Sequence, residues 1–381
     1  MKKTLAVLGA ALVASSAMVA GLPSAGTAGP SAGGLSSENV EWVDYVPFNV
    51  GTASGAKIIG KHMYVTSWHN FSIYDVSDPL KPTELSTTPF GFKFENEDVD
   101  GNDKIMIFSE ELPLASVHVW DVEDKSNPVE LAVLDGAGQH TMSCLQNCKW
   151  LYGSDGNIVD LRDPANPKLV GHKWSEGLPV GNAHDINEIA PGRVLTSSDP
   201  MMLLDTKNPL KPKLLAAAEP MGEFIHSSKW PQEGRDRFAL STGETCYPGS
   251  DAACNESSGG FTTWDASKWK KTHTLTKIET FRPPSGTYVD GNPPSGTTFG
   301  CSTHWFEPHP DFKNGGIVGV GMFNHGTHFM GVDKKGHITD EGYFVPHAGN
   351  SAAVYWMTDE IVYSVDLQKG FDVLKWHGVQ K

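Results

Sequence analysis

A short pattern of apolar and polar positions recurs along the chain. An apolar run ends in an aspartate, and a polar turn that contains proline follows it. The runs are rich in β-branched and aromatic residues, as buried strands are. In such turns Asp and Asn bond to their own backbone, and proline presets its φ angle. The pattern therefore predicts a strand followed by a tight turn, and its clearest copies cover residues 71–85, 117–131, 156–170 and 201–215.

Three weaker copies follow, at residues 261–275, 328–342 and 361–375. Most copies lie about 45 residues apart, which is the length of one four-stranded propeller blade. The two longer gaps hold loop-like insertions. We therefore expect an all-β fold, a seven-bladed β-propeller of four-stranded blades, that forms a single domain over residues 35–381. The seven marker aspartates are Asp75, Asp121, Asp160, Asp205, Asp265, Asp333 and Asp366.

One copy carries a recognisable motif. Residues 73–82 read IYDVSDPLKP, which resembles the V-x-D-V-S-D-P-x-x-P pattern of the LVIVD-repeat family. The resemblance covers nearly the whole chain after residue 34 and is closest in the first four copies. It implies a β-propeller. Because the family is functionally mixed, the resemblance implies a fold and little about activity.

Two segments near the chain ends resemble the fourth strand of a blade. They are ENVEWVDYVPF at residues 38–48 and FDVLKW at residues 371–376. One of them should complete the last blade, because a missing fourth strand would leave an open sheet edge.

Composition agrees with this fold and excludes some partners. Of the 381 residues, 40 are glycine and 25 are proline, which suits short strands joined by tight turns. The formal net charge is −15. Binding to nucleic acid or to an anionic membrane requires basic patches, so the charge argues against both. We expect a monomer that binds no nucleic acid.

The N-terminus has the organisation of a secretory signal. Lys2 and Lys3 precede an apolar run of small residues at 5–21, and a flexible small-residue stretch extends to residue 34. We predict a signal peptide and flexible segment in residues 1–34, cleaved between about residues 20 and 34. A retained N-terminal membrane anchor is the alternative. No later segment is apolar enough to span a bilayer, so we expect a secreted, extracellular protein without a membrane span once the signal is removed.

Export permits disulfides, and the chain has five cysteines. Cys144 and Cys148 flank a short turn, and Cys246 and Cys254 flank a polar loop. Each pair is a candidate disulfide, although sequence alone does not determine the connectivity. Cys301 is left over, either as a buried free thiol or as a metal ligand or reactive thiol.

Five histidines occupy one position of the repeat. Each follows the fourth strand of the preceding blade and stands at the entrance of the first strand of its own blade. First strands are innermost and line the central channel, so these side chains should meet at one end of it. The second blade offers Glu95, Glu97 and Asp98 at this position, and the first blade offers only Thr52 and Ser54. The five histidines are His140, His184, His226, His304 and His347.

A second set of polar residues falls in the loops between second and third strands. These loops share a face with the histidines because strands in a blade alternate in direction. Their side chains should lie outside the histidines and orient them, for example by accepting the second imidazole N–H. The set comprises His69, Asp199, Glu244, His325 and His328.

Several imidazoles directed at one point are typical of a metal site. Neutral imidazole is the commonest biological metal ligand, and metal–nitrogen bonds are short, so the ligands must converge. With a nearby carboxylate such a site suits Cu, Fe or Zn, and Glu97, Asp98 and Glu244 are the candidate catalytic groups. No organic cofactor is indicated. The alternative is that the histidines bond to neighbouring strands and to water, with no metal present.

Three functions remain open. The first is a Cu- or Fe-dependent oxidoreductase or oxygenase, because multi-histidine sites suit redox chemistry. The predicted arrangement is similar to that of carotenoid-cleaving oxygenases, which hold iron by histidines on a propeller axis, although the chain has no sequence match to them. The second is a non-catalytic propeller that binds a small molecule, peptide, protein or glycan at the channel mouth. The third is a metal-dependent hydrolase; the chain has no G-x-S-x-G or H-E-x-x-H motif.

Overall fold

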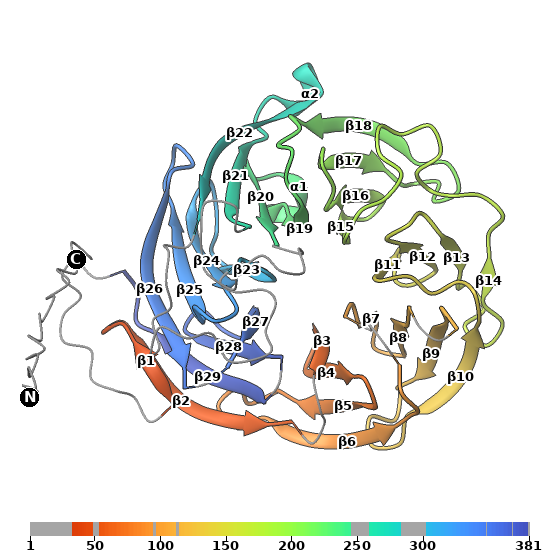
Figure 1. Cartoon of the computed structure of the whole chain (residues 1–381), viewed down its shortest axis with the longest axis horizontal. Coiled ribbons are helices and arrows are strands. Elements are labelled where there is room, and N and C mark those ends of the chain that lie inside the picture. The colour runs from red at the N-terminus through yellow and green to blue at the C-terminus, as the bar shows by residue number, and fades with distance from the viewer. Residues whose placement is uncertain are drawn as a thin grey trace, which may run out of the picture.

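The computed structural model describes residues 33–48, 53–93, 97–111, 114–244, 259–282, 302–347, 349–367 and 369–379. These residues form an all-β ring of sheets around a common centre (Figure 1). Two short helices, α1 (Pro231–Gly234) and α2 (Trp269–Thr272), lie on connections between strands. Within the same ranges, no helix is long and apolar enough to cross a membrane.

Each of the clear sequence repeats contributes to an antiparallel unit of four strands, ordered from the centre of the ring outwards (Figure 1). The middle strands are almost entirely buried, whereas the outer strands are partly exposed. The first unit is β3 (Ala53–Ile59), β4 (His62–Ser67), β5 (Asn70–Asp75) and β6 (Thr83–Pro89). The second is β7 (Asp100–Gly101), β8 (Ile105–Ser109), β9 (Val117–Asp121) and β10 (Val129–Leu134), and the third is β11 (Met142–Leu145), β12 (Trp150–Gly153), β13 (Ile158–Asp160) and β14 (Lys168–Leu169).

The next two units share one eight-stranded sheet, because their outer strands β18 and β22 pair in parallel. One of them is β15 (Ile186–Ala190), β16 (Arg193–Thr196), β17 (Met202–Asp205) and β18 (Lys213–Ala218). The other is β19 (Ile225–Lys229), β20 (Phe238–Gly243), β21 (Phe261–Asp265) and β22 (Thr274–Phe281). A further unit consists of β23 (Phe306–Pro308), β24 (Gly316–Gly321), β25 (Thr327–Val332) and β26 (Ile338–Pro346).

Strands from both ends of the chain close the ring. The last sheet has the order β27 (Ser351–Trp356), β28 (Ile361–Asp366), β29 (Gly370–Trp376) and β2 (Val40–Pro47). The N-terminal segment is therefore the outer strand, as expected, and the FDVLKW segment is the third strand of the same sheet rather than a fourth strand. In addition, β1 (Gly34–Ser36) pairs with β26 and gives the preceding sheet a fifth strand.

The marker aspartates show why the repeat has its local sequence. In six copies the carboxylate accepts a hydrogen bond from the backbone N–H two residues later, so the side chain closes the turn after the third strand. The seventh copy differs. Asp366 ends the second strand of its sheet, and it accepts the backbone N–H groups of Asn350 and Lys369. The expectation that it marks a third strand was wrong.

Hydrophobic residues fill the spaces between neighbouring sheets. Between the first and last sheets, Met63, Val65 and Tyr74 pack against Tyr363 and Phe371. The rings of Tyr74 and Phe371 meet edge to face at 5.8 Å, a geometry that aromatic pairs prefer. A hydrophobic cluster therefore joins the first and last sheets, and the pairing of β2 with β29 also holds the ring closed.

The cysteines fall into two groups. Cys144 and Cys148 form a disulfide across the turn that follows β11. Cys246, Cys254 and Cys301 lie outside the described residues, as do Thr52 and Glu95 and the side chain of Ser54.

Candidate metal centre

The inner strands bring four histidines and one glutamate to the centre of the ring. His140, His184 and His304 each stand two residues before an inner strand, namely β11, β15 and β23, and His226 is the second residue of β19. Glu97 stands three residues before β7. Because these strands surround the centre (Figure 1), their entrances direct all five side chains toward one region.

Hydrogen bonds within a unit and from the preceding unit hold the backbones of two of the histidines in place. The amide of His184 donates to Ser197 O at 2.8 Å, and the Thr141 hydroxyl donates to the carbonyl of His184. In the same way the amide of His304 donates to Gly321 O at 2.9 Å, and the Thr242 hydroxyl donates to its carbonyl at 2.5 Å. In both histidines the backbone amide and the backbone carbonyl are therefore hydrogen-bonded.

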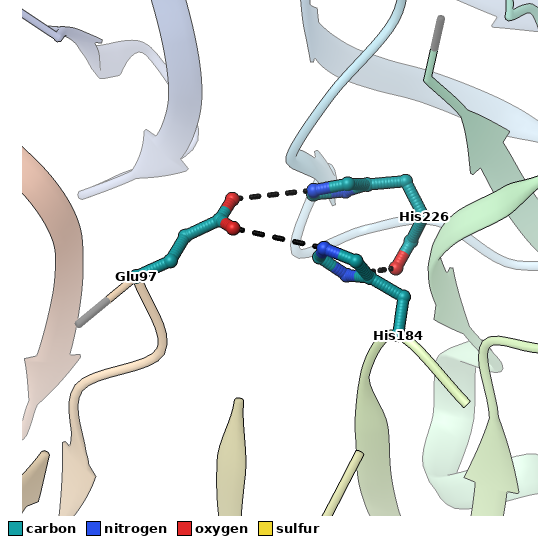
Figure 2. Close-up of side chains that lie close together, drawn as sticks. All are labelled: Glu97, His184 and His226. Carbon is teal, nitrogen blue, oxygen red and sulfur yellow. Dashed lines mark hydrogen bonds and ion pairs between the residues drawn. The ribbon is translucent and has the colours of Figure 1, made fainter. Parts of the chain in front are cut away.

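The Nε2 atoms of the four histidines converge on the carboxylate of Glu97. Oε2 of Glu97 lies 3.0 Å from Nε2 of His140 and 3.6 Å from Nε2 of His184. Oε1 lies 2.8 Å from Nε2 of His304 and 3.2 Å from Nε2 of His226. Figure 2 shows Glu97 pointing from its own segment toward the rings of His184 and His226.

Three of the four opposite ring nitrogens face hydrogen-bond acceptors, whereas the buried Nδ1 of His226 has no hydrogen-bond partner among the described residues. Nδ1 of His184 donates to the carbonyl of His226 at 3.0 Å, a bond also drawn in Figure 2. Nδ1 of His304 donates to the carbonyl of Ala352 at 2.8 Å, and Nδ1 of His140 lies 3.0 Å from a carboxylate oxygen of Glu111. When Nδ1–H is donated to such a partner, the neutral ring has Nε2 as the nitrogen that can bind a metal ion, which is the usual arrangement of a metal-ligating histidine.

Two of the Nε2 atoms lie close to each other. Nε2 of His140 and Nε2 of His184 are only 2.9 Å apart, although the Nδ1 atoms of both rings face acceptors. Two lone pairs at this distance repel unless a proton or a metal ion lies between them. A metal ion that accepted both lone pairs, at metal–nitrogen distances of about 2.0–2.1 Å, would remove this repulsion.

The charges of these groups depend on one another. Burial alone would raise the pKa of Glu97, but hydrogen bonds from His140, His226 and His304 outweigh it and hold the pKa well below the usual range. Burial, followed by repulsion between the charged forms of His184 and His226, holds the pKa of His184 well below its usual value, which favours the neutral form of this imidazole. Burial also disfavours the charged form of His304, yet hydrogen bonding and charge from Glu97, with the charge of Glu244, raise its pKa.

A second carboxylate reaches the same histidines from the loop after β20. Glu244 Oε1 lies 3.6 Å from Nε2 of His304, and Oε2 lies 3.9 Å from Nε2 of His226. Two sets of three ligand atoms result, each within 4.8 Å: Glu97 with His184 and His226, and Glu244 with His226 and His304. His226 belongs to both. We call the four histidines with Glu97 and Glu244 the axial cluster.

His347 lies apart from the axial cluster. Its side chain is exposed, its amide donates to Gly33 O at 3.0 Å, and its carbonyl accepts Lys369 Nζ at 2.6 Å. The inner strand of its sheet begins at Ser351, so the entrance is occupied by Asn350 instead. The cause is the irregular seventh copy. Asp366 ends the second strand of its sheet and not the third, so the first strand begins closer to Asp366 than the repeat predicts, and His347 lies before its entrance.

Of the other predicted residues, Asp199 lies near the axial cluster, whereas His328 and His69 make other contacts. Asp199 accepts the amides of Met221 and Gly222 at 2.8 and 2.6 Å and lines a pocket with His140 and His184. His328 is buried between Asp340, at 2.8 Å, and the carbonyl of His325, at 3.1 Å, which is a packing role. The ring of His69 lies against Phe92.

Asp98 faces away from the histidines although it follows Glu97 directly. It accepts the Ser143 hydroxyl at 3.0 Å, and burial together with the charges of Asp185 and Asp100 raises its pKa well above the usual value. It lines a channel cavity of about 550 Å³, which Glu97 borders and where Lys57 pairs with Asp100 at 3.3 Å.

Glu111, which bonds to Nδ1 of His140, was not among the predicted residues. It follows the second strand of its unit, which is the position of the predicted outer set, and the sequence FSEEL offers two glutamates there. Only the three-dimensional structure shows that Glu111 reaches His140 while Glu110 pairs with Lys93 at 3.3 Å.

Comparisons with known proteins agree with this fold. The LVIVD-repeat family matches residues 50–88, so the chain carries an LVIVD repeat, as its resemblance predicted. No curated protein sequence matches significantly.

Solved structures with the same architecture include the RRP9 WD40 repeats, at a TM-score of 0.58 and 8% identity over 91% of this chain and 98% of that one. The N-terminal domain of Nup159 follows at 0.55 and 12%, over 88% and 95%. A chain from an S. cerevisiae complex of dbp5 with nup159 and gle1 matches at 0.55 and 10%, also over 88% and 95%. At such low identity the likeness shows a β-propeller fold alone.

Proposed function

We propose that the chain is an exported, seven-bladed β-propeller that binds one transition-metal ion at the axial cluster. The blade count rests on the six hydrogen-bonded sheets, one of which has eight strands and contains two four-stranded units. Export rests on the basic and apolar order of residues 1–34. The ion would be held by Nε2 of His140, His184, His226 and His304 together with Glu97.

One observation carries the proposal: four Nε2 atoms from four consecutive inner strands face one carboxylate, while three of the Nδ1 atoms face acceptors. Purely structural histidines would need their Nε2 groups matched with acceptors one by one. Here a single carboxylate serves all four. The donor set, imidazole nitrogen with carboxylate oxygen, is one that Cu, Fe and Zn prefer.

The cluster has one open side. The side chain of His140 is 30% exposed, whereas those of His184, His226 and His304 are 5%, 0% and 4% exposed. Among the described histidines of the cluster, His140 is therefore the one past which a ligand can approach. Held there, copper or iron would supply redox chemistry and zinc would supply Lewis acidity. We favour a Cu- or Fe-dependent oxidoreductase, because a four-imidazole set is richer in nitrogen than the three-ligand sets of hydrolytic zinc sites.

Metal analysis tests the proposal and separates it from a non-catalytic binding scaffold. Protein purified without a histidine tag is measured by mass spectrometry of its metals, as isolated and after reconstitution with Cu(II), Fe(II) or Zn(II). We expect about one equivalent of one metal, and less than about 0.2 equivalents after every reconstitution would contradict the proposal. His184→Ala should abolish uptake and leave the fold intact.

The matched control is His377→Ala, which removes an imidazole that pairs with Glu41 at 2.9 Å near the chain end. This variant should take up metal as the wild type does. Equal uptake by the two variants would mean that the metal binds elsewhere.

A further inference from the structure

A small pocket opens on the exposed side of the axial cluster. Its volume is about 280 Å³, and His140 and His184 are the cluster members that line it. Phe224 lies beside them, with its ring edge to face against His184 at 5.3 Å between centroids. Phe224 is 43% exposed. An aromatic ring that stays open to a pocket beside candidate metal ligands provides a surface for a flat apolar molecule.

The rest of the pocket wall restricts the ligand. Val180, Ala183 and Ile225 add apolar surface next to Phe224. Apart from the histidines, the charged lining residues among those described are Asp155, Asp199 and Glu223; Glu223 pairs with Arg282 at 2.6 Å, so the acidic character of the wall comes from Asp155 and Asp199. A cavity with acids and no lysine or arginine in its described wall disfavours anions. Its volume lies just below that of drug-sized sites, which suits a molecule with a single ring.

We propose that this pocket binds a small, uncharged aromatic molecule, with its ring against Phe224 and its polar atom toward His140. This inference rests on the proposed metal site, because His140 marks the open side of the cluster. The pocket itself is formed by the protein alone, so ligand binding can be measured with and without metal.

The probe is p-cresol, and p-toluate and 4-methylcyclohexanol are its comparisons. The first has the same ring with a negative charge, and the second has a similar size without an aromatic ring. Binding is measured by isothermal titration calorimetry and by ligand-observed NMR on metal-free and metal-loaded protein. We expect p-cresol to bind at least about tenfold more tightly than p-toluate, because of the acidic wall. Phe224→Ala should weaken p-cresol binding roughly three- to tenfold, and Phe224→Leu should weaken it while affecting 4-methylcyclohexanol little.

Phe92→Ala is the matched control, since Phe92 is also exposed, at 49%, and lies against Trp68 and His69 away from this pocket. Metal content is measured in every variant and should equal that of the wild type. Equal binding of p-cresol and p-toluate, or equal affinity of the Phe224→Ala and Phe92→Ala variants, would overturn the pocket assignment while the metal site stands. Binding of p-cresol that depends on Phe224 in a protein that takes up no metal would support the pocket and refute the proposed function.

Discussion

Replacing Glu97 by glutamine removes a negative charge from the middle of the axial cluster and keeps the size of the side chain. The two carboxylate oxygens lie 2.8–3.6 Å from Nε2 of four histidines. An amide keeps one oxygen and turns an NH₂ group toward the remaining nitrogens, where a cation is proposed to bind. We expect metal affinity to fall by at least about 10- to 100-fold, which is the range for the loss of a carboxylate that only supports a ligand.

The thermal consequence follows from mass action. At a metal concentration of about 100 times the wild-type Kd, bound metal stabilises the folded protein by about 2.7 kcal/mol. At the same concentration, a variant with 10- to 100-fold weaker binding keeps about 1.4 to 0.4 kcal/mol. The difference, about 1.3–2.3 kcal/mol, lowers the metal-bound Tm by roughly 3–9 °C, since large domains shift by about 2–4 °C per kcal/mol.

Scanning calorimetry with and without metal measures this difference directly. Each variant is its own reference, so a change in the stability of the metal-free protein does not enter the result. Glu41→Gln is the control, because it alters a Glu–His pair, with His377, outside the cluster. If Glu97→Gln shows the same metal-dependent rise in Tm as Glu41→Gln, the carboxylate does not support a bound ion and the reasoning fails.

Three further outcomes are expected. Burial, together with the charge of Asp366, raises the pKa of Asp372 from 3.8 to about 6, so the stability associated with its neutral form is complete below pH 3.8 and is lost as the pH rises through 6. Asp372→Asn should thus stabilise the protein by up to about 3 kcal/mol at pH 7 and hardly at all at pH 3.5, in urea unfolding at both pH values. His347→Ala should leave the metal stoichiometry unchanged, in contrast to His184→Ala. Cys144→Ser should lower the unfolding free energy by roughly 2 kcal/mol, as expected for the short loop that ends at Cys148.

The fold could be predicted from the sequence because most repeats contain an aspartate that closes the turn after a strand. Six marker aspartates close the turn that their position predicts, and each identifies a third strand. The seventh copy shows the limit of such signals. The run that ends at Asp366 has the composition of a third strand but becomes a second one, because β29 and the N-terminal β2 supply the two strands outside it. Pairing between distant segments, not local sequence, decides strand order there.

The positions of most residues of the candidate site could also be predicted from the sequence. Position in the repeat places His140, His184, His226 and His304 at inner-strand entrances, where the structure has them. The same reasoning predicted both Glu97 and Asp98 as candidate catalytic groups. Only the three-dimensional packing distinguishes them, because Glu97 contacts the imidazoles and Asp98 contacts Ser143. A residue such as Glu111, which contacts a histidine of a neighbouring blade, cannot be recognised from the sequence of its own repeat.

Among the described residues of the first blade, Gly55 has a steric relation to the site. Gly55, on the inner strand β3, lies so close to the segment of Glu97 that an added Cβ would overlap the Glu97 carbonyl oxygen. A side chain at this entrance would push that backbone away and carry the carboxylate with it. Gly55 is therefore part of the site, because the absence of a side chain there makes room for the residue that faces all four histidines.

Gly55→Ala tests this reading. The Glu97 carbonyl is backbone and cannot rotate aside, so the segment must shift, and we expect metal affinity to drop by at least about tenfold. Gly171→Ala is the matched control, since an added Cβ there meets no atom within 4 Å. Near-ultraviolet circular dichroism reports whether the aromatic packing between blades survives. Wild-type metal affinity in a folded Gly55→Ala protein would show that the position of Glu97 does not determine how the cluster binds metal.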